Sequence, residues 1–407
     1  MPPHETSATV SPIQTADEQV RVVMVSGFLG AGKTTALQTI GERLTDQGYT
    51  VGMITNDQAS GLVDTSILDR TDGTVVEIPG GCFCCNFDEL LQASSTISQQ
   101  DVDILLAEPV GSCTDLVATV INPLRSMYAD EFAVAPLTVI LDPARVQSYL
   151  DETTETLPEE VRYIFRLQIE EADVVVLNKT DMLTDDDTAR LVNQLQDRVG
   201  DRPVIPLSAK HQDGIDRWLS MIVTDEETDD PSDADGRVTA EGRALTDIDY
   251  DTYADGEAKL GWVNLTVTLD GQFEAAQFTT ELMDRVHQSL RADSIEVAHL
   301  KFSLAAAEDL SHANLTATDA EPRYTNIDLG SVTEGRLVFN ARAVGNPEEI
   351  RTIATDALTA TARTLKTEIT IEKEQAFRPE YPEPTHRIDD DAVPASGLDT
   401  SDLAQFD

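Results

Sequence analysis

The stretch Gly27-Phe28-Leu29-Gly30-Ala31-Gly32-Lys33-Thr34-Thr35 decides the fold of this chain. It follows an apolar, β-branched run at 21–25 and precedes a helix-like segment at 36–44, which is the context of a phosphate-binding loop. The glycines let backbone N–H groups converge on one point, and the helix N-terminus adds partial positive charge there. A loop that merely joins strand to helix is the alternative, and the full pattern in this context disfavours it. The predicted nucleotide contacts are Gly27, Gly30, Ala31, Gly32, Lys33, Thr34 and Thr35.

Within this loop, two side chains have distinct expected roles. Lys33 can reach the β- and γ-phosphates, and the Thr34 hydroxyl can bind Mg²⁺. Glu108 ends another apolar strand predicted at 103–107, where a carboxylate can hold Mg²⁺, usually through water. Gly111 follows and can approach a γ-phosphate closely. A surface acid at a helix terminus is the alternative for Glu108.

A second βα connection adds a candidate switch. A strand predicted at 50–55 delivers Asn56 and Asp57 at its carboxyl end, where ligands of open α/β sheets gather. We expect residues 57–64 to be a switch loop near the γ-phosphate, with Asp57 orienting water or magnesium. An ordinary polar loop stays open as the alternative.

The tetrad Asn178-Lys179-Thr180-Asp181 predicts guanine recognition. It follows a buried strand predicted at 173–177. The Asp181 carboxylate can accept hydrogen bonds from the N1–H and exocyclic amine of guanine, a donor pair that adenine lacks. Asn178 is expected to brace the loop, and the Lys179 stem to cover the base. The later triplet Ser208-Ala209-Lys210 follows a strand at 203–207 and offers a backbone N–H to guanine O6.

The cysteines indicate a metal site. Of the four cysteines, Cys82, Cys84 and Cys85 crowd together, and Cys113 stands alone. Such crowding is poor for a disulfide framework and suits thiolate ligation of Zn²⁺ in a reducing compartment. Two or three thiolates could bind one ion. Small buried residues or redox-active thiols are the alternatives, and Cys113 is expected to be a small buried residue.

Charge and composition narrow the classes of partner. The 407-residue chain carries a net charge of −45, from 74 acidic against 29 basic residues spread along its length. Dispersed acid of this kind indicates adaptation to high salt rather than one acidic block that captures a basic partner. It disfavours nucleic acid, which needs a basic face. No long apolar run or signal-peptide pattern occurs, so we expect a cytoplasmic protein without a membrane partner.

The pattern along the chain predicts an α/β P-loop GTPase domain with a mainly parallel sheet and a smaller α+β domain. We expect a loose tail at 1–20, the GTPase domain at 21–223, an acidic linker at 224–258 and the second domain at 259–377. The second domain has the order β-α-β-β-α-β of a ferredoxin-like unit, and its expected role is recognition of a partner or cargo. Residues 378–407, rich in Pro and Asp, are expected to be a disordered acidic tail.

Taken together, these motifs resemble the CobW-type metallochaperone GTPases, a P-loop group that includes HypB- and UreG-like proteins. The resemblance is carried by residues 27–35, Asn56-Asp57 through Asp64, Gly81-Cys82-Phe83-Cys84-Cys85, Glu108 with Gly111, and 178–181. It implies GTP hydrolysis coupled to binding of zinc, cobalt or another divalent metal, and its transfer to a client metalloprotein or cofactor-synthesis enzyme. It also admits a homodimer.

On this resemblance, Lys33, Asp57 and Glu108 carry the catalytic roles, Thr34 and Glu108 hold Mg²⁺, and Cys82, Cys84 and Cys85 bind Zn²⁺ or Co²⁺. Two features depart from the family pattern. The six histidines are scattered rather than gathered in a metal-storage stretch, and Pro109 stands where relatives often have a small hydroxyl residue.

Two other functions stay open from the sequence. One is a GTPase chaperone with a purely structural zinc, which assists maturation of a cobalamin- or nickel-dependent enzyme. The other is an ATP-dependent small-molecule kinase, which the guanine motif at 178–181 disfavours.

Overall fold

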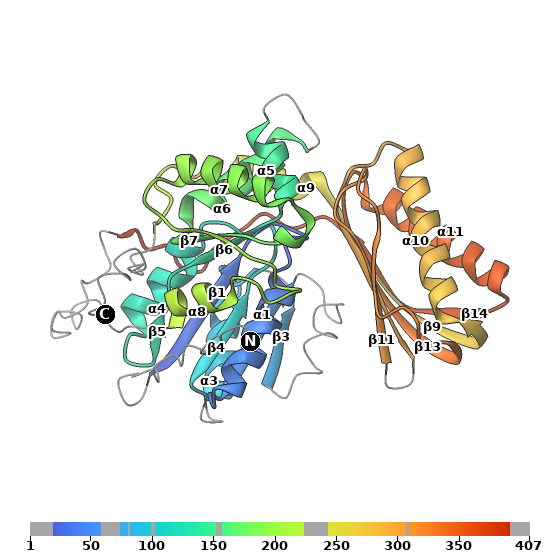
Figure 1. Cartoon of the computed structure of the whole chain (residues 1–407), viewed down its shortest axis with the longest axis horizontal. Coiled ribbons are helices and arrows are strands. Elements are labelled where there is room, and N and C mark those ends of the chain that lie inside the picture. The colour runs from blue at the N-terminus through green and yellow to red at the C-terminus, as the bar shows by residue number, and fades with distance from the viewer. Residues whose placement is uncertain are drawn as a thin grey trace, which may run out of the picture.

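The computed structural model has two domains that lie side by side (Figure 1). It describes residues 19–57, 74–79, 82–98, 102–151, 157–223, 243–306 and 309–390. The predicted switch loop beyond Asp57 lies outside these residues, as do positions 1–18, 224–242 and 391–407 of the predicted tails and linker.

The first domain is built on an eight-stranded sheet with parallel pairing. The strand order is β3-β2-β4-β1-β6-β7-β8, and β5 pairs with β1. Parallel pairing brings the carboxyl ends of the strands to one edge, where open α/β sheets bind ligands. The strands are β1 (Val20–Ser26), β2 (Val51–Asp57), β3 (Thr74–Pro79), β4 (Ile104–Glu108), β5 (Phe132–Val134), β6 (Thr138–Leu141), β7 (Val174–Leu177) and β8 (Val204–Pro206).

Helices cover both faces of this sheet, because β1 is apolar on both sides. Val22 and Met24 belong to one core with α3 and α6, whereas Val23 and Val25 belong to another with α1 and α8. Continuous apolar strands are typical of such doubly covered sheets. The helices are α1 (Lys33–Asp46), α3 (Phe87–Ser98), α4 (Asn122–Met127), α5 (Pro143–Leu150), α6 (Glu159–Glu171), α7 (Asp185–Val199) and α8 (Ile215–Val223).

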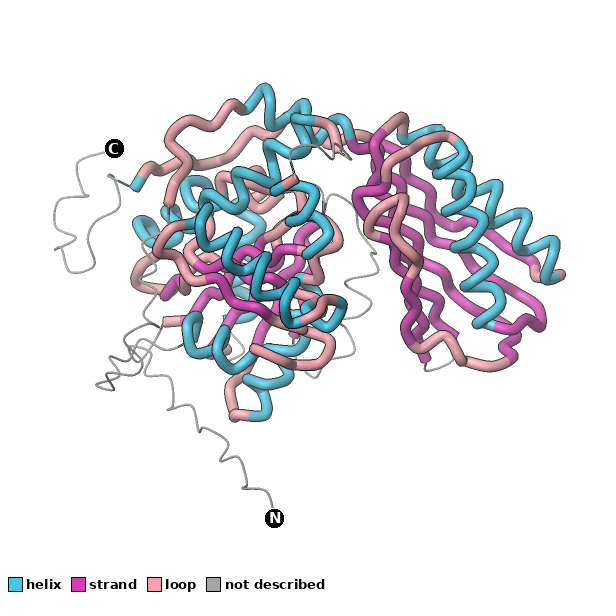
Figure 2. Tube along the Cα trace, turned by 45° about the horizontal axis from the view of Figure 1, so that its top comes forward, coloured by secondary structure: helices cyan, strands magenta, loops and turns pink. Residues whose placement is uncertain are grey.

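The second domain is an antiparallel sheet with helices α10 and α11 on one face. Figure 2 shows the sheet on the side of the first domain and the two helices on the far side. The order is β12-β11-β10-β13-β9-β14. Its elements are β9 (Leu260–Glu274), α10 (Ala275–Ala292), β10 (Val297–Ala306), β11 (Asp309–Leu315), β12 (Arg323–Thr325), β13 (Ser331–Val344), α11 (Pro347–Leu365) and β14 (Glu368–Phe377).

The predicted fold class is therefore confirmed: a parallel α/β domain joined to a smaller α+β domain. Strands β10, β13, β9 and β14 with α10 and α11 form the predicted ferredoxin-like unit. Strands β11 and β12, which were not predicted from the sequence, extend the sheet beyond β10. No helix among the described residues has the length and apolarity needed to cross a membrane.

Two segments differ from the expectation of unstructured chain. Helix α9 (Tyr250–Lys259), which packs on α6, forms from the end of the predicted linker and the first residue of the predicted second domain. The Asp249 side chain caps this helix by accepting hydrogen bonds from the backbone N–H groups of Asp251 and Thr252, at 3.0 and 3.2 Å. Residues 378–390 of the predicted tail return across the first domain, where residue 385 bonds the backbone of Cys84. Their polar composition is typical of disorder, but specific polar contacts hold them.

Candidate nucleotide site and cysteine cluster

The phosphate loop between β1 and α1 has a backbone that only glycine permits. Gly30 and Gly32 have φ of 79° and 95°, in the left-handed region. A Cβ on Gly32 would lie 2.6 Å from the Asn178 amide nitrogen. Lys33 is buried, and its Nζ donates to the Gly27 carbonyl at 2.9 Å. The loop therefore presents backbone N–H groups and one ammonium group to the same space.

Thr34 and Glu108 meet beside this loop. The Thr34 hydroxyl donates to the Glu108 carboxylate, at 2.9 Å to Oε2 and 3.1 Å to Oε1. Lys33 Nζ lies 3.8 Å from Glu108 Oε1. A Cβ on Gly111 would lie 3.1 Å from Lys33 Nζ, so this glycine leaves the approach to the ammonium open. A hydroxyl and a carboxylate oxygen side by side are a donor set that suits Mg²⁺.

The candidate base-binding residues hold one another and the phosphate loop. Asn178 donates to the Ala31 carbonyl at 2.9 Å and accepts from the Ala209 N–H at 3.0 Å. The Ser208 hydroxyl donates to Asp181 at 2.7 Å. Asn178 thus braces the loop, as its place in the tetrad led us to expect.

Lys179 has an unusual backbone and a fixed side chain. Its φ of 59° places it in the left-handed region. Its ammonium pairs with Asp142 at 2.7 Å and donates to the Gly30 carbonyl at 2.5 Å. The Lys179 side chain therefore runs across the phosphate loop.

One cavity of about 870 Å³ unites these groups. Gly27, Ala31 and Ser208 lie behind its wall and contact residues that line it. The side chain of Asp57 lies outside the described part of the chain. The predicted residues that line the cavity are Gly30, Gly32, Lys33, Thr34, Thr35, Glu108, Gly111, Asn178, Lys179, Asp181, Ala209 and Lys210.

The opposite wall comes from the sheet of the second domain, which sequence reasoning missed. Polar residues alternate with apolar ones along β10, as in His299, Lys301 and Ser303, and this period indicated a polar sheet face. It could not indicate what that face meets. The wall includes His299, Lys301, Asn314, Arg323, Asn340 and Arg342.

The sheet touches the phosphate loop directly. A Cβ on Gly30 would lie 2.9 Å from Thr316 Cγ2 and 3.5 Å from the His299 ring. Arg145, at the start of α5, donates to the Val297 carbonyl at 2.7 Å and lies 3.8 Å from Glu296. Burial lowers the pKa of His299 to about 3, so this ring is neutral against the loop.

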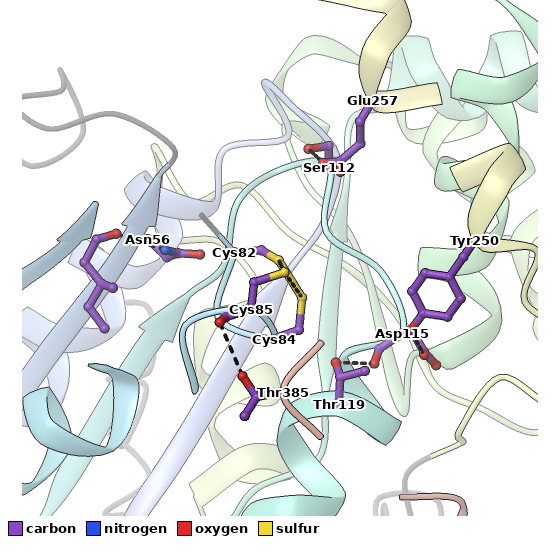
Figure 3. Close-up of a disulfide and its surroundings, with 11 residues drawn as sticks. Asn56, Cys82, Cys84, Cys85, Ser112, Asp115, Thr119, Tyr250, Glu257 and Thr385 are labelled. Atoms are coloured by element: carbon purple, nitrogen blue, oxygen red, sulfur yellow. Dashed lines mark hydrogen bonds between the residues drawn. A yellow bond between two sulfur atoms is a disulfide. The ribbon is translucent and has the colours of Figure 1, made fainter. Parts of the chain in front are cut away.

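The three clustered cysteines lie together just before the start of α3 (Figure 3), and none of them lines the nucleotide cavity. Their Sγ atoms all lie within 4.8 Å of one another. Cys85 Sγ is 3.2 Å from Cys82 Sγ and 3.7 Å from Cys84 Sγ. Thiolates on a tetrahedral Zn²⁺ are about 3.8 Å apart, given Zn–S bonds of about 2.3 Å. The separation between Cys84 Sγ and Cys85 Sγ matches this value.

A disulfide joins Cys82 to Cys84, a pairing that was not predicted from the sequence. Cys85 is a half-buried free thiol, and burial raises its pKa. Because metal ligation needs thiolates, the disulfide must be reduced before Cys82 and Cys84 can bind an ion. Cys113 is fully buried, as expected of it.

The segment from Gly111 to Asp115 connects the cavity to the region of the cysteines. Gln168 donates to the Gly111 and Cys113 carbonyls at 3.1 and 2.8 Å. The Ser112 hydroxyl donates to Glu257 of α9 at 2.5 Å (Figure 3). Burial raises the pKa of Glu257 to about 7. Partners from α6 and α9 therefore hold this segment in place.

Glu171, at the end of α6, holds the same segment from the other side. It accepts from the Thr114 hydroxyl at 3.1 Å and from the Val117 N–H at 3.4 Å. It is fully buried, and burial raises its pKa to about 8, with the charge of Asp115 adding to the effect.

The raised pKa of Glu171 predicts that stability falls with rising pH. The folded state keeps a proton that the unfolded chain loses above its ordinary value of 4.5. The stabilising contribution is therefore complete below pH 4.5 and is lost as pH rises through the folded value of about 8. The slope approaches about 1.4 kcal/mol per pH unit inside this window. Denaturant unfolding between pH 6 and pH 9 measures it.

The substitution Glu171→Gln is expected to flatten this dependence, because a neutral amide can bond both Thr114 and Val117. Glu170→Gln is the matched control, since Glu170 is an exposed neighbour on α6 that pairs with Arg166. Equal pH slopes in the wild type and the Glu171 variant would show that Glu171 is ionised in the folded state.

Comparisons with known proteins agree with the motifs. Residues 21–206 match the family model described as CobW/HypB/UreG, nucleotide-binding domain. The zinc chaperone YeiR of Escherichia coli is 30% identical over 190 residues, which are 46% of this chain and 54% of that protein. The zinc chaperone CobW of Pseudomonas aeruginosa is 29% identical over 201 residues, covering 42% and 51%. The chain thus spans about half the length of these curated relatives.

Solved structures with a similar chain course include Zn(II)-bound YjiA GTPase from E. coli and HypB from Helicobacter pylori in complex with nickel. The first is 16% identical with a TM-score of 0.33, covering 84% of this chain and 99% of that one. The second is 17% identical with a TM-score of 0.36, covering 50% and 85%. With the phosphate loop, the residue 178–181 tetrad and the cysteine cluster in place, the family match identifies residues 21–206 of this chain as a nucleotide-binding domain of the CobW/HypB/UreG type.

Proposed function

We propose that this protein is a GTP-dependent metallochaperone. It binds Mg²⁺·GTP in the cavity between its domains, hydrolyses the nucleotide, and binds Zn²⁺ or Co²⁺ through Cys82, Cys84 and Cys85 for delivery to a client protein. The observation that carries the proposal is that one cavity is lined by Lys33, Glu108 and Asp181, with the cysteine cluster in the same domain.

The charges around the cavity support a polyphosphate ligand. Lys33 and Lys179 line it from the first domain, and Lys301, Arg323 and Arg342 line it from the second. In a chain with a net charge of −45, this local excess of cations favours an anion. The second domain would thereby take part in nucleotide binding.

In this proposal each residue has a defined task. Lys33 neutralises charge that develops on the γ-phosphate, and Thr34 and Glu108 hold Mg²⁺, which supplies further charge stabilisation when bound. Asp181 selects guanine, and Asn178 keeps the base loop on the phosphate loop through Ala31. Asp57 is proposed to orient water. Among the residues that the structure describes, the site has few groups that could activate water, which implies slow turnover and suits a switch.

The proposed metal cargo fits the cysteine cluster. Once reduced, three thiols gathered within 4.8 Å of one another can hold a zinc ion, and thiolate ligands also accept Co²⁺. The relatives named as zinc chaperones favour zinc over cobalt as the proposed cargo. The client is proposed to be a metalloprotein or a cofactor-synthesis enzyme.

The test is the zinc affinity of the reduced full chain in high salt, measured by chelator competition. We expect the affinity to differ about 10- to 100-fold between a Mg²⁺·GTP analogue and GDP, because the nucleotide state and the metal state are coupled. Cys84→Ser is expected to lose zinc binding. Cys113→Ala is the matched control, since it removes a buried cysteine outside the cluster.

Two outcomes would contradict the proposal. Unchanged zinc affinity in Cys84→Ser would show that the metal binds elsewhere. Equal affinities in both nucleotide states would leave a structural zinc, and would favour the other candidate, a GTPase chaperone for maturation of a cobalamin- or nickel-dependent enzyme.

A further inference from the structure

Residues 383–390 lie on the backbone of the cysteine cluster. The Thr385 N–H donates to the Cys84 carbonyl at 2.8 Å, and the Thr385 hydroxyl donates to the Cys85 carbonyl at 3.3 Å (Figure 3). The backbone of Glu383 hydrogen-bonds the Cys85 side chain. The His386 ring packs edge-on against Phe87, with centroids 5.1 Å apart. This segment therefore covers part of the approach to the thiols.

An ion pair anchors the segment to the first domain. Arg387 Nε lies 2.9 Å from Asp115 Oδ2, and Asp115 is 1% exposed. Tyr250 also donates to this carboxylate, at 2.6 Å. Removing Arg387 would take the cation from a buried charge, which is costly. Asp115 thus gives the segment a strong and specific attachment.

Polar contacts secure the end of the segment. The Ile388 N–H donates to the Ala118 carbonyl at 2.8 Å. Asn122 donates to the Ile388 carbonyl and to Asp390, both at 2.9 Å. Asp390 also accepts from the Ala244 N–H at 3.0 Å. These bonds position the backbone residue by residue, as in the docking of an extended peptide.

The segment has the character of a removable occupant. From residue 383 to residue 390 each residue is exposed or half-exposed. Its attachment therefore rests on hydrogen bonds and one ion pair rather than on buried apolar area. Segments of this kind open at a lower free energy than the core does.

We propose that the surface around Cys84 and Cys85 is a docking site for an extended peptide, and that residues 383–390 are its resident occupant. We call these residues the strap. The strap restricts access to the thiols, so metal exchange with a partner requires its displacement.

The strap also has a route to the nucleotide cavity. Asp115, its anchor, ends the segment that begins at Gly111, and Gly111 lines the cavity. A nucleotide that moves Gly111 would move the anchor of the strap. This link between nucleotide and strap rests on the proposed function, whereas protection of the thiols by the strap does not.

Protection of the thiols by the strap is tested by the rate at which N-ethylmaleimide alkylates the reduced, nucleotide-free full chain. Mass spectrometry follows the reaction at each cysteine. Arg387→Ala is expected to speed alkylation of Cys85 about fivefold or more. Arg351→Ala is the control, because Arg351 also makes ion pairs, with Glu348 and Glu374 on the second domain. Equal rates at Cys85 in the wild type and Arg387→Ala would overturn the proposal.

Cys113 serves as an internal reporter of unfolding, since it is fully buried. If Arg387→Ala also exposes Cys113, the deciding variant is Thr385→Pro, which removes the N–H bonded to Cys84 and leaves the Asp115 ion pair intact. Faster alkylation of Cys85 with Cys113 protected supports the cover, and an unchanged rate overturns it.

The nucleotide link is tested by the same reaction with a Mg²⁺·GTP analogue and with GDP, after binding of each is measured separately. We expect the two Cys85 rates to differ about twofold or more in the wild type and to converge in Arg387→Ala. A difference that persists in Arg387→Ala would overturn the link but not the cover. Failure of either nucleotide to bind would overturn the proposed function and the link, while the nucleotide-free rates still test the cover.

Discussion

Replacing Lys33 by alanine is expected to weaken GTP binding about 100-fold or more. The Lys33 ammonium is buried beside the Glu108 carboxylate, 3.8 Å from Oε1, and donates to the Gly27 carbonyl. This ammonium lies beside Gly111, where the γ-phosphate of a bound triphosphate is predicted to lie. Its loss also removes a positive charge that lies beside Glu108. Titration with a fluorescent GTP analogue measures the affinity.

Lys259→Ala is the matched control. Lys259 pairs with Glu160 at 3.4 Å on the surface of α9 and does not line the cavity. GTP affinity within about threefold of wild type is expected for this control. A Lys33 variant that binds GTP as the control does would show that the phosphates lie elsewhere.

Replacing Asp181 by asparagine is expected to weaken GTP binding about 100-fold and to change the preferred base from guanine to xanthine. The Asp181 carboxylate accepts a hydrogen bond from Ser208 and lines the cavity, so it can accept from guanine N1–H and the exocyclic amine. An asparagine amide places a donor against those donors. The same amide can donate to the 2-oxo group of xanthine, so XTP is expected to bind the variant better than GTP does.

Competition among GTP, XTP and ATP measures this preference, with Asp270→Asn as control. Asp270 is an exposed residue of β9 in the second domain and does not line the cavity. Unchanged GTP affinity in Asp181→Asn would make the base assignment wrong. Wild-type preference for ATP would favour the small-molecule kinase.

Local patterns in the sequence predicted the parts of the site that lie close together along the chain. The phosphate loop is one such part, because its glycines, lysine and threonine occupy consecutive positions between a strand and a helix. The structure adds the reason that positions 32 and 111 are glycines. A side chain at Gly32 would crowd Asn178, and one at Gly111 would crowd Lys33. The cysteine cluster is another local part, although its disulfide was not predicted, since pairing depends on the fold of one short turn.

The order of strands and helices likewise predicted both domains. Apolar runs indicated the buried parallel strands, and alternation indicated the half-buried strands of the second sheet. The extra strands β11 and β12 were missed. The register of β11 is set by pairing with β10, and that of β12 by pairing with β11, and both are tertiary properties.

By itself the sequence determined the fold class, the phosphate loop, the guanine motif and the clustering of three thiols, because each depends on residues near one another in the chain. Only the tertiary structure decided which parts of the chain face the phosphate loop and which parts contact the cysteine cluster. The sheet of the second domain closes the nucleotide cavity, and Arg387 reaches Asp115 across 272 residues. Such contacts arise only when segments far apart in the sequence meet in the folded protein. The polar composition of residues 378–390 is typical of a disordered segment, so the sequence did not indicate that these residues bind the first domain.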